Sequence, residues 1–533
     1  MMGRLKAFNE LLKTQAWVRG LLIASGVLII TAIASFGARG PKSDKITTGS
    51  NDIGSEQGVS GPELSPGDAT SVVTDGGSPI PGASVGPTVK KVTKGGVTSG
   101  GVSVEGLNFG LKTQGITAKE VKVGMSYNVA ACGDAGVLQA MFANQAGDIK
   151  KAIDTFARYV NERGGVGGGR TYKPIIVDDG GSGCPEKSVA AAIKMADEEK
   201  VFLAIPGLDV VSDYVISRKV PVWGGRDDPD SLAKSGPNGL ALFAPADPTL
   251  EAWASFGKHY LKSGTTKHTD LAAGNLPCLV RIETGASGNW DIPQTILVSK
   301  MKKYGMEFGD IMVFEDKLET AQSQSNTIVV RAKNKGCGHI YFMAGNSVGL
   351  IFMTDAATQN QYFPKWTWTS RTALSDDDNI SKLMDQVQWE NAIGLSTRVP
   401  GHPKAGNCKK IYETYNGNDG QGDSAAVLIA CTGILSTSEI MNRGYKKTGV
   451  LDSNSFLLGA DAIRNDFYWD AHVPMEYSFP SAAGPFKTRG FSHWTVADWS
   501  STEGRYLFPK YPCYYRTFGP NNGGCEDLRA TFK

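Results

Sequence analysis

The chain has 533 residues and is 41% hydrophobic, which is enough for two ordinary domains that each bury a core. Its 55 basic and 53 acidic residues give a formal net charge of only +2. This balance provides no electrostatic basis for binding nucleic acid, and most of the charges are expected to lie on a solvated surface.

An uncharged segment near the start of the chain predicts a membrane anchor. The 19 residues from 20 to 38 carry no charge, and as a helix they span a hydrocarbon core of about 30 Å. Four basic residues and one acidic residue precede them, so residues 1–19 are expected to be cytoplasmic and the remainder extracellular. A cleaved signal peptide, which would leave a secreted protein, is the alternative, because Ala32-Ile33-Ala34 has the form of a cleavage site.

A polar stretch from residue 39 to 114 is predicted to be a flexible linker. From residue 40 to 114, 40 of 75 residues are Gly, Ser, Thr or Pro, and Phe109 is the only aromatic residue. Such a composition buries too little apolar area to offset the entropy of ordering. A flexible chain of this length reaches roughly 50 Å.

Strands and helices then alternate twice. The first series predicts strands at 121–126, 173–178, 201–205 and 220–223, with helices at 147–163, 185–199 and 209–218. The second predicts strands at 278–282, 311–314, 340–343 and 365–369, with helices at 249–261, 292–304, 323–335 and 349–359. The pattern predicts an α/β fold of two doubly wound lobes joined by crossover strands.

The expected domains follow from these two series. Lobe 1 takes residues 115–245 with about 371–450, because helices at 405–415 and 423–443 are expected to return to it. Lobe 2 takes 246–370 with about 486–510. Residues 451–533 form an aromatic, loop-rich C-terminal region that the pattern does not assign.

Sequence motifs for catalysis and for cofactor binding are weak. The glycine-rich run at 164–170 follows a predicted helix and precedes a strand, so it predicts a tight turn and not a nucleotide site. The six histidines have no metal-ligand spacing, and no nucleophile elbow, zinc motif or P-loop occurs. The sequence therefore predicts neither an enzyme nor a bound cofactor or metal.

The first lobe resembles a known family. Its features, in order, are a K-V-G strand near Val123, a helix ending in Y-V-N-E-R-G-G-V, a G-R turn, an acidic strand end and a strand reading V-F-L-A-I-P-G. This order is similar to that of periplasmic binding proteins of the leucine/isoleucine/valine-binding type, and 493–508 is similar to the family's closing strands. The resemblance covers most of residues 115–508 and implies two lobes, joined by three crossover strands, that close on a small solute.

The resemblance, with the rule that ligands bind beyond the carboxyl ends of strands, implies a binding site. Its segments are 127–130, 207–209, 224–228, 285–290, 345–347 and 370–372. Within them the candidate ligand-binding residues are Tyr127, Asn128, Gly207, Asp209, Arg226, Ser287, Asn289, Trp290, Asn346 and Arg371.

These loops differ from those of the family's amino-acid binders, which offer Ser, Thr and backbone donors. Arg226 is suited to a carboxylate, but the following two aspartates would equally neutralise it. Asp209 is either an ammonium partner or the N-cap of the next helix. Tyr127 and Trp290 either stack on the solute or line a core.

Eight cysteines follow the apolar segment, and in an exported chain they are expected to form disulfides. In the implied fold, the strands before Cys132 and Cys184 are neighbours, as are those that Cys278 and Cys337 enter. Cys408 and Cys431 lie on successive helices, and Cys513 and Cys525 close a short loop. The expected pairs are therefore 132–184, 278–337, 408–431 and 513–525.

The predicted function is extracytoplasmic capture of a small solute, such as an amino acid, an amide or another small polar or aromatic compound. The expected partners are the permease and ATPase of an ABC-type importer. The alternative is a membrane-anchored sensor or a wall-associated binding ectodomain of the same fold. An anchored hydrolase would need a nucleophile–base pair that the sequence does not offer.

Overall fold

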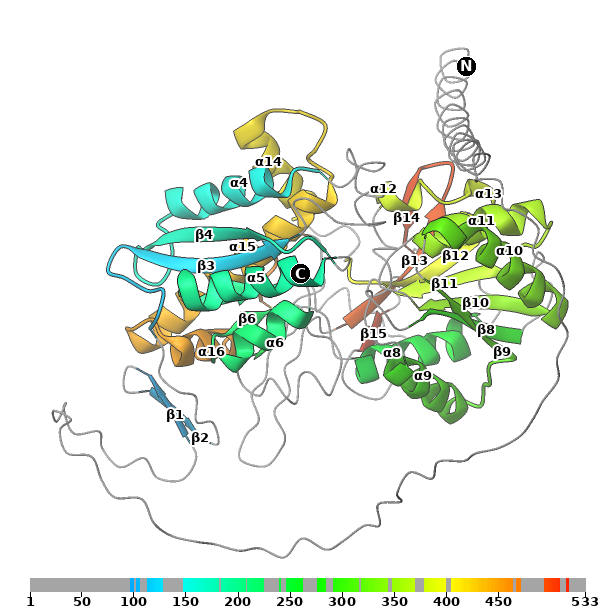
Figure 1. Cartoon of the computed structure of the whole chain (residues 1–533), viewed down its shortest axis with the longest axis horizontal. Coiled ribbons are helices and arrows are strands. Elements are labelled where there is room, and N and C mark those ends of the chain that lie inside the picture. The colour runs from blue at the N-terminus through cyan, green and yellow to red at the C-terminus, as the bar shows by residue number, and fades with distance from the viewer. Residues whose placement is uncertain are drawn as a thin grey trace, which may run out of the picture. The chain divides into compact units, whose positions relative to one another are not determined.

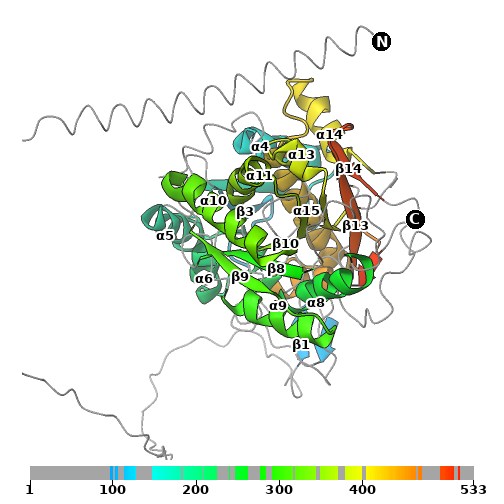
Figure 2. The same ribbon diagram turned by 90° about the vertical axis from the view of Figure 1, so that its right-hand side faces the viewer.

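The computed structural model describes part of the chain, and its elements are coloured in Figures 1 and 2. The described residues are 96–99, 102–105, 113–127, 147–181, 184–207, 209–224, 239–240, 246–261, 276–283, 291–315, 318–343, 348–369, 378–398, 404–463, 466–470, 493–508 and 514–516. The predicted anchor at 20–38 and most of the predicted linker lie outside them.

Lobe 1 is built on a five-stranded sheet. In the order β4-β3-β5-β6-β7, its strands are Thr171–Asp178, Glu120–Tyr127, Leu203–Ile205, Val222–Trp223 and Gly239–Leu240. Every neighbouring pair is parallel. The buried strand β5 is continuously apolar, as expected when helices cover both faces of a sheet.

Helices cover both faces of this sheet, so lobe 1 is doubly wound as predicted (Figure 1). On one face lie α4 (Ile149–Glu162), α14 (Asn407–Asn416), α15 (Ala425–Thr448) and α16 (Ser453–Asp461). On the other lie α5 (Pro185–Ile193), the π-helix η1 (Lys194–Glu198) and α6 (Asp209–Ser217). The predicted return of the two helices after residue 405 to lobe 1 is confirmed.

Lobe 2 has a larger, mixed sheet. In the order β14-β13-β12-β11-β10-β8-β9, its strands are Arg505–Leu507, His493–Ser500, Ala392–Ser396, Lys365–Thr369, Cys337–Met343, Leu276–Ile282 and Asp310–Phe314. The strands β8 to β12 are parallel, whereas β13 runs antiparallel to β12 and also pairs with β14 and β15 (Tyr514–Arg516). The closing strands expected at 493–508 are therefore present.

Helices also cover both faces of the lobe 2 sheet. The helices α8 (Ala246–Phe256) and α9 (Asp291–Lys303) pack on one face, with the π-helix η3 (Gly257–Leu261) following α8. The helices α10 (Leu318–Lys335), α11 (Val348–Gln359) and α13 (Gln386–Trp389) pack on the other, and the short α12 (Asp378–Ser381) lies near β14. The two α/β sheets predicted from the sequence are thus both present.

The boundary between the lobes differs from the predicted one. Residues from about 371 were expected in lobe 1, yet β12 pairs with β11 and the α13 residue Trp389 is buried in the lobe 2 core. The chain returns to lobe 1 only after Arg398, since Cys408 is the next residue in that lobe's core. The short β12 sequence AIGLS carries too little periodicity to be recognised as a strand.

Two further elements were not predicted. Helix α16 lies in the unassigned C-terminal region, where Asp452 and Ser455 form a capping box at its start. A hairpin of β1 (Gly96–Ser99) and β2 (Val102–Glu105) lies in the segment expected to be unstructured. Its signal was the Gly-Gly dipeptide between two valine-containing runs, which favours a two-residue hairpin turn.

The glycine-rich run at 164–170 forms the tight turn that the sequence predicted. An isolated antiparallel bridge pairs Val166 with Arg170, and their backbone groups exchange two hydrogen bonds of 2.8 and 2.9 Å. The turn therefore connects α4 to β4. A nucleotide-binding loop would instead follow a strand and lead into a helix.

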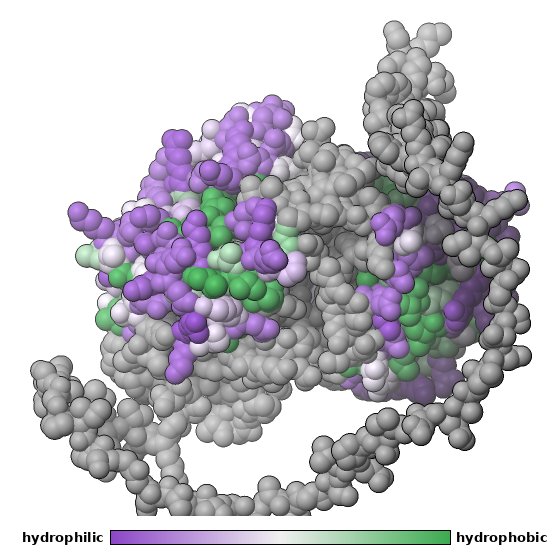
Figure 3. All heavy atoms as spheres, viewed as in Figure 1, coloured by the Kyte–Doolittle hydropathy of each residue, from purple (hydrophilic) through white to green (hydrophobic). Residues whose placement is uncertain are grey.

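Among the described residues, one helix is long and apolar enough to cross a membrane. This helix is α15, and two thirds of its most apolar window is buried within the protein. Its faces pack on α4 and α16 in the lobe 1 core, which is the behaviour of a core helix. The part of the lobe 1 surface that Figure 3 colours is largely hydrophilic, with small apolar areas. Among the large apolar side chains of lobe 1 that are exposed are Val189 and Val210.

The disulfides agree with the expected pairing wherever the structure describes both partners. Cys278 pairs with Cys337 in lobe 2 and Cys408 pairs with Cys431 in lobe 1, with Cα atoms 5.7 and 5.8 Å apart. Cys184 is also disulfide-bonded. Cys132, Cys513 and Cys525 lie outside the described residues.

Helices α15 and α16 approach so closely that glycine is required on both. A Cβ atom on Gly444 would lie 2.0 Å from the carbonyl oxygen of Ser455, and one on Gly459 would lie 2.0 Å from that of Ile440. Both obstacles are backbone atoms, so no side-chain rotation relieves the clash.

We expect Gly444→Ala to lower the free energy of unfolding by about 1–3 kcal/mol, because α15 and α16 must separate. Gly433→Ala on the same helix is the matched control, since its Cβ would meet nothing nearer than 3.4 Å. That change should be neutral or stabilising by up to about 1 kcal/mol through helix propensity. Urea denaturation of the two variants measures the difference, and equal midpoints would contradict the packing argument.

Candidate functional site

Each sheet has one place where successive connections leave on opposite sides. In lobe 1 this switch point lies between β3 and β5, and in lobe 2 it lies between β8 and β10. At a switch point the loops diverge, so a crevice opens beyond the carboxyl ends of the strands. A binding crevice is therefore expected beyond the carboxyl ends of β3, β5, β8 and β10.

At the lobe 1 switch point, Ser126 near the end of β3 is the centre of a buried polar network. Its hydroxyl donates to Oδ2 of Asp179 over 2.9 Å and accepts from the backbone N–H of Gly207 over 2.9 Å. Asp179 directly follows β4, and Gly207 is the second residue after β5. One side chain thus ties together the ends of three neighbouring strands.

Asp179 is almost completely buried, with 1% of its surface exposed. Its second carboxylate oxygen accepts from the N–H of Gly181 over 3.0 Å, and its backbone carbonyl accepts from Ser188 over 2.9 Å. Burial raises the pKa of this carboxyl, whereas the hydrogen bonds from Gly181 and Ser126 oppose the rise. The group is therefore a fixed acceptor whose charge is costly to maintain.

Gly207 cannot carry a side chain in this arrangement. A Cβ atom there would lie 2.8 Å from Oδ2 of Asp179 and 2.8 Å from the carbonyl oxygen of Ser126. The loop after β5 therefore packs directly against the Ser126–Asp179 pair. This contact fixes where the loop leaves the sheet.

In lobe 2, arginines are bound near two strand ends. Arg281, near the end of β8, donates to the side chain of Gln294 on α9 and to the carbonyl of Ile282. Just after β12, Arg398 Nη1 lies 3.1 Å from both carboxylate oxygens of Asp378. Asp378 also accepts from the backbone N–H of Tyr506 on β14 over 3.1 Å.

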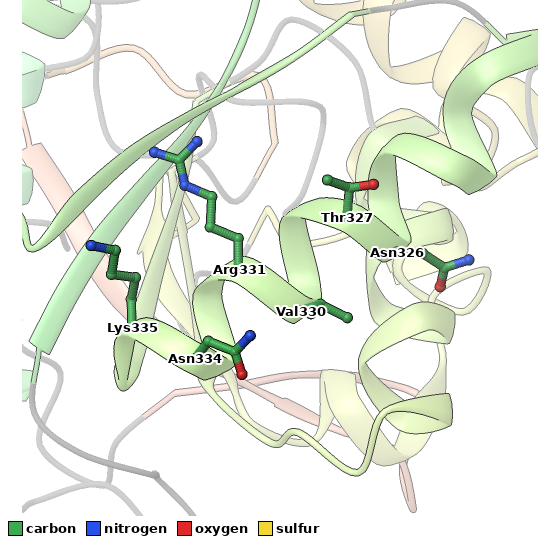
Figure 4. A pocket seen from close by; sticks show the side chains of 6 residues that line it. All are labelled: Asn326, Thr327, Val330, Arg331, Asn334 and Lys335. Atoms are coloured by element: carbon green, nitrogen blue, oxygen red, sulfur yellow. The ribbon is translucent and has the colours of Figure 1, made fainter.

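The described residues include no group of three or more His, Cys, Asp or Glu side chains arranged to hold a metal ion. A hollow of about 760 Å³ lies over α10, lined by Asn326, Thr327, Val330, Arg331, Asn334 and Lys335 (Figure 4). All six lie on one helix, and Arg331 is engaged by Asp310 at 2.6 Å. This surface therefore lacks the converging groups of a binding site.

The fold matches those of solved solute-binding proteins. A branched-chain amino acid ABC transporter from Thermus thermophilus with bound valine superposes with a TM-score of 0.57 at 10% identity, over 74% of this chain and 97% of its own. A fatty acid ABC transporter substrate-binding protein from Thermomonospora curvata gives 0.55 at 14% identity, over 76% and 95%. A solute-binding protein of an ABC transporter from Rhodopseudomonas palustris BisB5, in complex with 3,4-dihydroxybenzoic acid, gives 0.54 at 13% identity, over 75% and 98%.

The chain has the type I periplasmic-binding-protein fold. This agrees with the resemblance seen in the sequence, although no family model and no curated protein sequence matches it. Because identity does not exceed 14% in these three structures, the likeness establishes the fold, and each bound solute remains a property of its own protein.

The type I fold places two of the predicted ligand-binding residues at the lobe 1 switch point. Tyr127 ends β3 and is half-buried, with its ring against the lobe 1 core; burial, followed by the nearby Tyr172 and Asp179, raises the pKa of its hydroxyl. Gly207 belongs to the Ser126 network. Their contact with a solute stays a prediction.

The other predicted ligand-binding residues are not placed. Asp209 begins α6, but its side chain is outside the described part, so the choice between N-cap and ammonium partner stays open. Residues Asn128, Arg226, Ser287, Asn289, Trp290, Asn346 and Arg371 all lie outside the described residues.

Sequence reasoning missed Ser126 and Asp179 as parts of the site. The available signal was the pair of aspartates at 178–179 directly after an apolar strand, which the resemblance counted only as an acidic strand end. Ser126 gave no signal, because its partners lie 53 and 81 residues away.

The raised pKa of Asp179 predicts a specific pH dependence. The folded protein holds this proton more tightly than the unfolded chain, whose carboxyl has a pKa of 3.8. The contribution of protonated Asp179 to the free energy of unfolding is therefore fully present below pH 3.8. It is lost as pH rises through the pKa of Asp179 in the folded state. Asp179→Asn has no proton to lose, so the difference in Tm between variant and wild type should move in favour of the variant from about pH 4 to about pH 8.

The variant Ser126→Ala provides a second test of the pKa of Asp179. Because the hydrogen bond from Ser126 lowers the pKa of Asp179, its removal should shift the wild-type decline in stability to higher pH. Thermal melts across the pH range measure both effects. Parallel Tm curves for the wild type and Asp179→Asn would contradict this account of the carboxyl.

Proposed function

We propose that this chain is an extracytoplasmic solute-binding protein that captures a small solute beyond the carboxyl ends of its two sheets. The observation that carries the proposal is the pair of doubly wound sheets, each with a switch point, in the fold of ABC transporter solute-binding proteins. The buried Ser126–Asp179–Gly207 network supports it, because it holds the loops of one switch point in a fixed position.

The proposed role is binding without catalysis. The three solved structures are described as transporter or solute-binding proteins, one with an amino acid and one with an aromatic acid. At the lobe 1 switch point, the buried hydroxyl of Ser126 is paired with a carboxylate and with a backbone N–H, and this pairing favours a positioning role.

The solute proposed here is a small carboxylate-bearing compound with an apolar or aromatic body. The valine and dihydroxybenzoate of the similar structures, together with the fatty acid protein, motivate this class. In the loops, Arg226 is the proposed carboxylate partner, and Trp290 is proposed to stack on the body of the solute.

We further propose delivery of the solute to an ABC-type importer from a membrane-anchored position. Residues 20–38 form the proposed anchor and residues 39–95 the tether. A sensor or wall-associated ectodomain is the second candidate. Genes for a permease and an ATPase beside the gene for this chain would favour the importer. Loss of solute uptake on deletion of the gene distinguishes the two.

A thermal-shift screen of the full chain tests the binding role. Branched-chain amino acids, medium-chain fatty acids and dihydroxybenzoates form the first panel. A true solute at a hundred times its Kd should stabilise the folded protein by about 2.7 kcal/mol.

Site variants make this test specific. Arg226→Ala and Trp290→Ala should remove most of the shift while leaving the melting temperature without solute unchanged. Arg505→Ala, at an exposed residue of β14, is the control and should keep the full shift. A shift that survives both site variants would contradict the proposed site.

Fractionation tests the proposed anchor. Full-length protein is expected in the membrane fraction, to be released by detergent or by proteolysis within residues 39–95. A variant in which Leu28 and Ile30 are both replaced by Arg should leave the membrane, because charged residues at the centre of a spanning helix are strongly disfavoured. Mature soluble protein that begins near Ser35 would instead support cleavage.

A further inference from the structure

Strand β15, in the C-terminal region, is deeply buried although it has only three residues. It pairs antiparallel with the beginning of β13, where Thr495 lies opposite Tyr514 and Trp494 lies opposite Tyr515. Tyr514 and Tyr515 have only 1% and 0% of their surface exposed. Both rings are therefore enclosed as fully as the interior side chains of either lobe.

Tyr515 holds this strand on lobe 2. It belongs, with its partner Trp494, to the core between the lobe 2 sheet and helices α8 and α9. Its ring centroid lies 6.1 Å from that of Phe256, the last residue of α8, in an edge-to-face arrangement. Backbone pairing with β13 and this ring contact therefore fix β15 on lobe 2 (Figure 1).

Tyr514 packs into the other lobe. The remaining buried residues of its core cluster all belong to lobe 1, and they include Trp223 of β6 and Trp469. Neighbouring side chains on a strand point to opposite faces, so adjacent residues can enter different cores. Strand β15 thus places one tyrosine in the core of each lobe.

The strand register explains why lobe 1 covers Tyr514. Side chains directly opposite each other on paired strands share a face, so Tyr514 lies on the face of Thr495. Thr495 alternates into line with Ala497 and Trp499, which belong to the core beneath α10, α11 and α13. Tyr514 lies on this face but in a different core. Lobe 1, and not a helix of lobe 2, therefore packs on Tyr514.

This contact lies at the edge of the lobe 2 sheet beyond which the solute is proposed to bind. Thr495 pairs with Ser396, the last residue of β12. Strand β12 is parallel to β11, and β11 is parallel to β10. Tyr514, opposite Thr495, is therefore near the carboxyl ends of the parallel strands.

We propose that β15 is a brace between the lobes, in which Tyr515 fixes the strand to lobe 2 and Tyr514 holds lobe 1. Crossovers of backbone alone permit hinge rotation, because a few dihedral angles absorb it. A ring buried in the opposite lobe resists that rotation, because it must leave a close-packed core. The brace rests on the proposed function in one respect, namely that lobe movement opens and closes the solute crevice.

Spin labels on one exposed residue of each lobe test the brace in the full chain without any solute. Labels attached through non-natural side chains at Arg158 on α4 and Lys302 on α9 leave the native disulfides intact. The distribution of distances between the labels, measured by electron paramagnetic resonance, should be broader in Tyr514→Ala than in the wild type. Tyr514→Phe should keep the wild-type width, because the ring is retained.

Tyr506→Ala is the matched control. Tyr506 is a buried tyrosine of β14 that pairs with the same strand β13, but its core lies in lobe 2. Both alanine variants lose a buried ring and should melt roughly 6–20 °C below the wild type. Of the two, Tyr514→Ala alone should broaden the distance distribution. A wild-type width in Tyr514→Ala, or equal broadening in both alanine variants, overturns the brace.

Tyr514→Leu decides the question if Tyr514→Ala does not fold. Leucine keeps part of the apolar volume but lacks the reach of the ring, so the distance distribution should again be broader than in the wild type. A wild-type width in Tyr514→Leu overturns the brace and leaves the proposed solute site unaffected. Conversely, a solute screen without any hit contradicts the proposed function and leaves this measurement valid, because no solute takes part in it.

Discussion

The arrangement at the lobe 1 switch point depends on the hydrogen bond from Ser126 to the buried carboxylate of Asp179, which joins the ends of β3 and β4. Ser126 also accepts from Gly207, so the ends of β3, β4 and β5 form one polar unit. The unit needs a small hydroxyl, a carboxylate and a residue without Cβ, because the space between them is already filled. Loops that leave the sheet from such a unit begin at fixed points, and a binding site benefits from that rigidity.

Periodicity predicted most strands and helices of both sheets, because burial between helices imposes a pattern that a single sequence displays. It failed where the element was short or its partner distant. The β12 strand has five residues with little alternation, and its place in lobe 2 depends on pairing with β11 and β13. The Ser126–Asp179 hydrogen bond could not be predicted from the sequence for the same reason, because the order of the strands, and not the local sequence, brings the two residues together.

The fold persists at 10–14% identity with the solved structures because it depends on few particular residues. A core position requires an apolar side chain of suitable volume, and many residues satisfy that requirement. The exceptions are positions where backbone approaches backbone. Gly444 and Gly459, which let α15 and α16 approach each other, cannot be replaced by a residue with a side chain without moving the helices apart. This difference explains how the fold is matched while no sequence model matches.

Several ionisable side chains of the described lobes are buried, and Asp179 and Lys365 differ in how their charges are compensated. Asp179 receives hydrogen bonds from Ser126 and Gly181, which together satisfy both of its carboxylate oxygens. Lys365 in lobe 2 is 4% exposed; its burial lowers the pKa of the amino group, and the opposite charge of Asp498 counters part of that effect. Compensation thus takes a different form in each lobe: hydrogen bonds from neighbouring loops hold the carboxylate of lobe 1, whereas a carboxylate on another strand of the same sheet acts on the lysine of lobe 2.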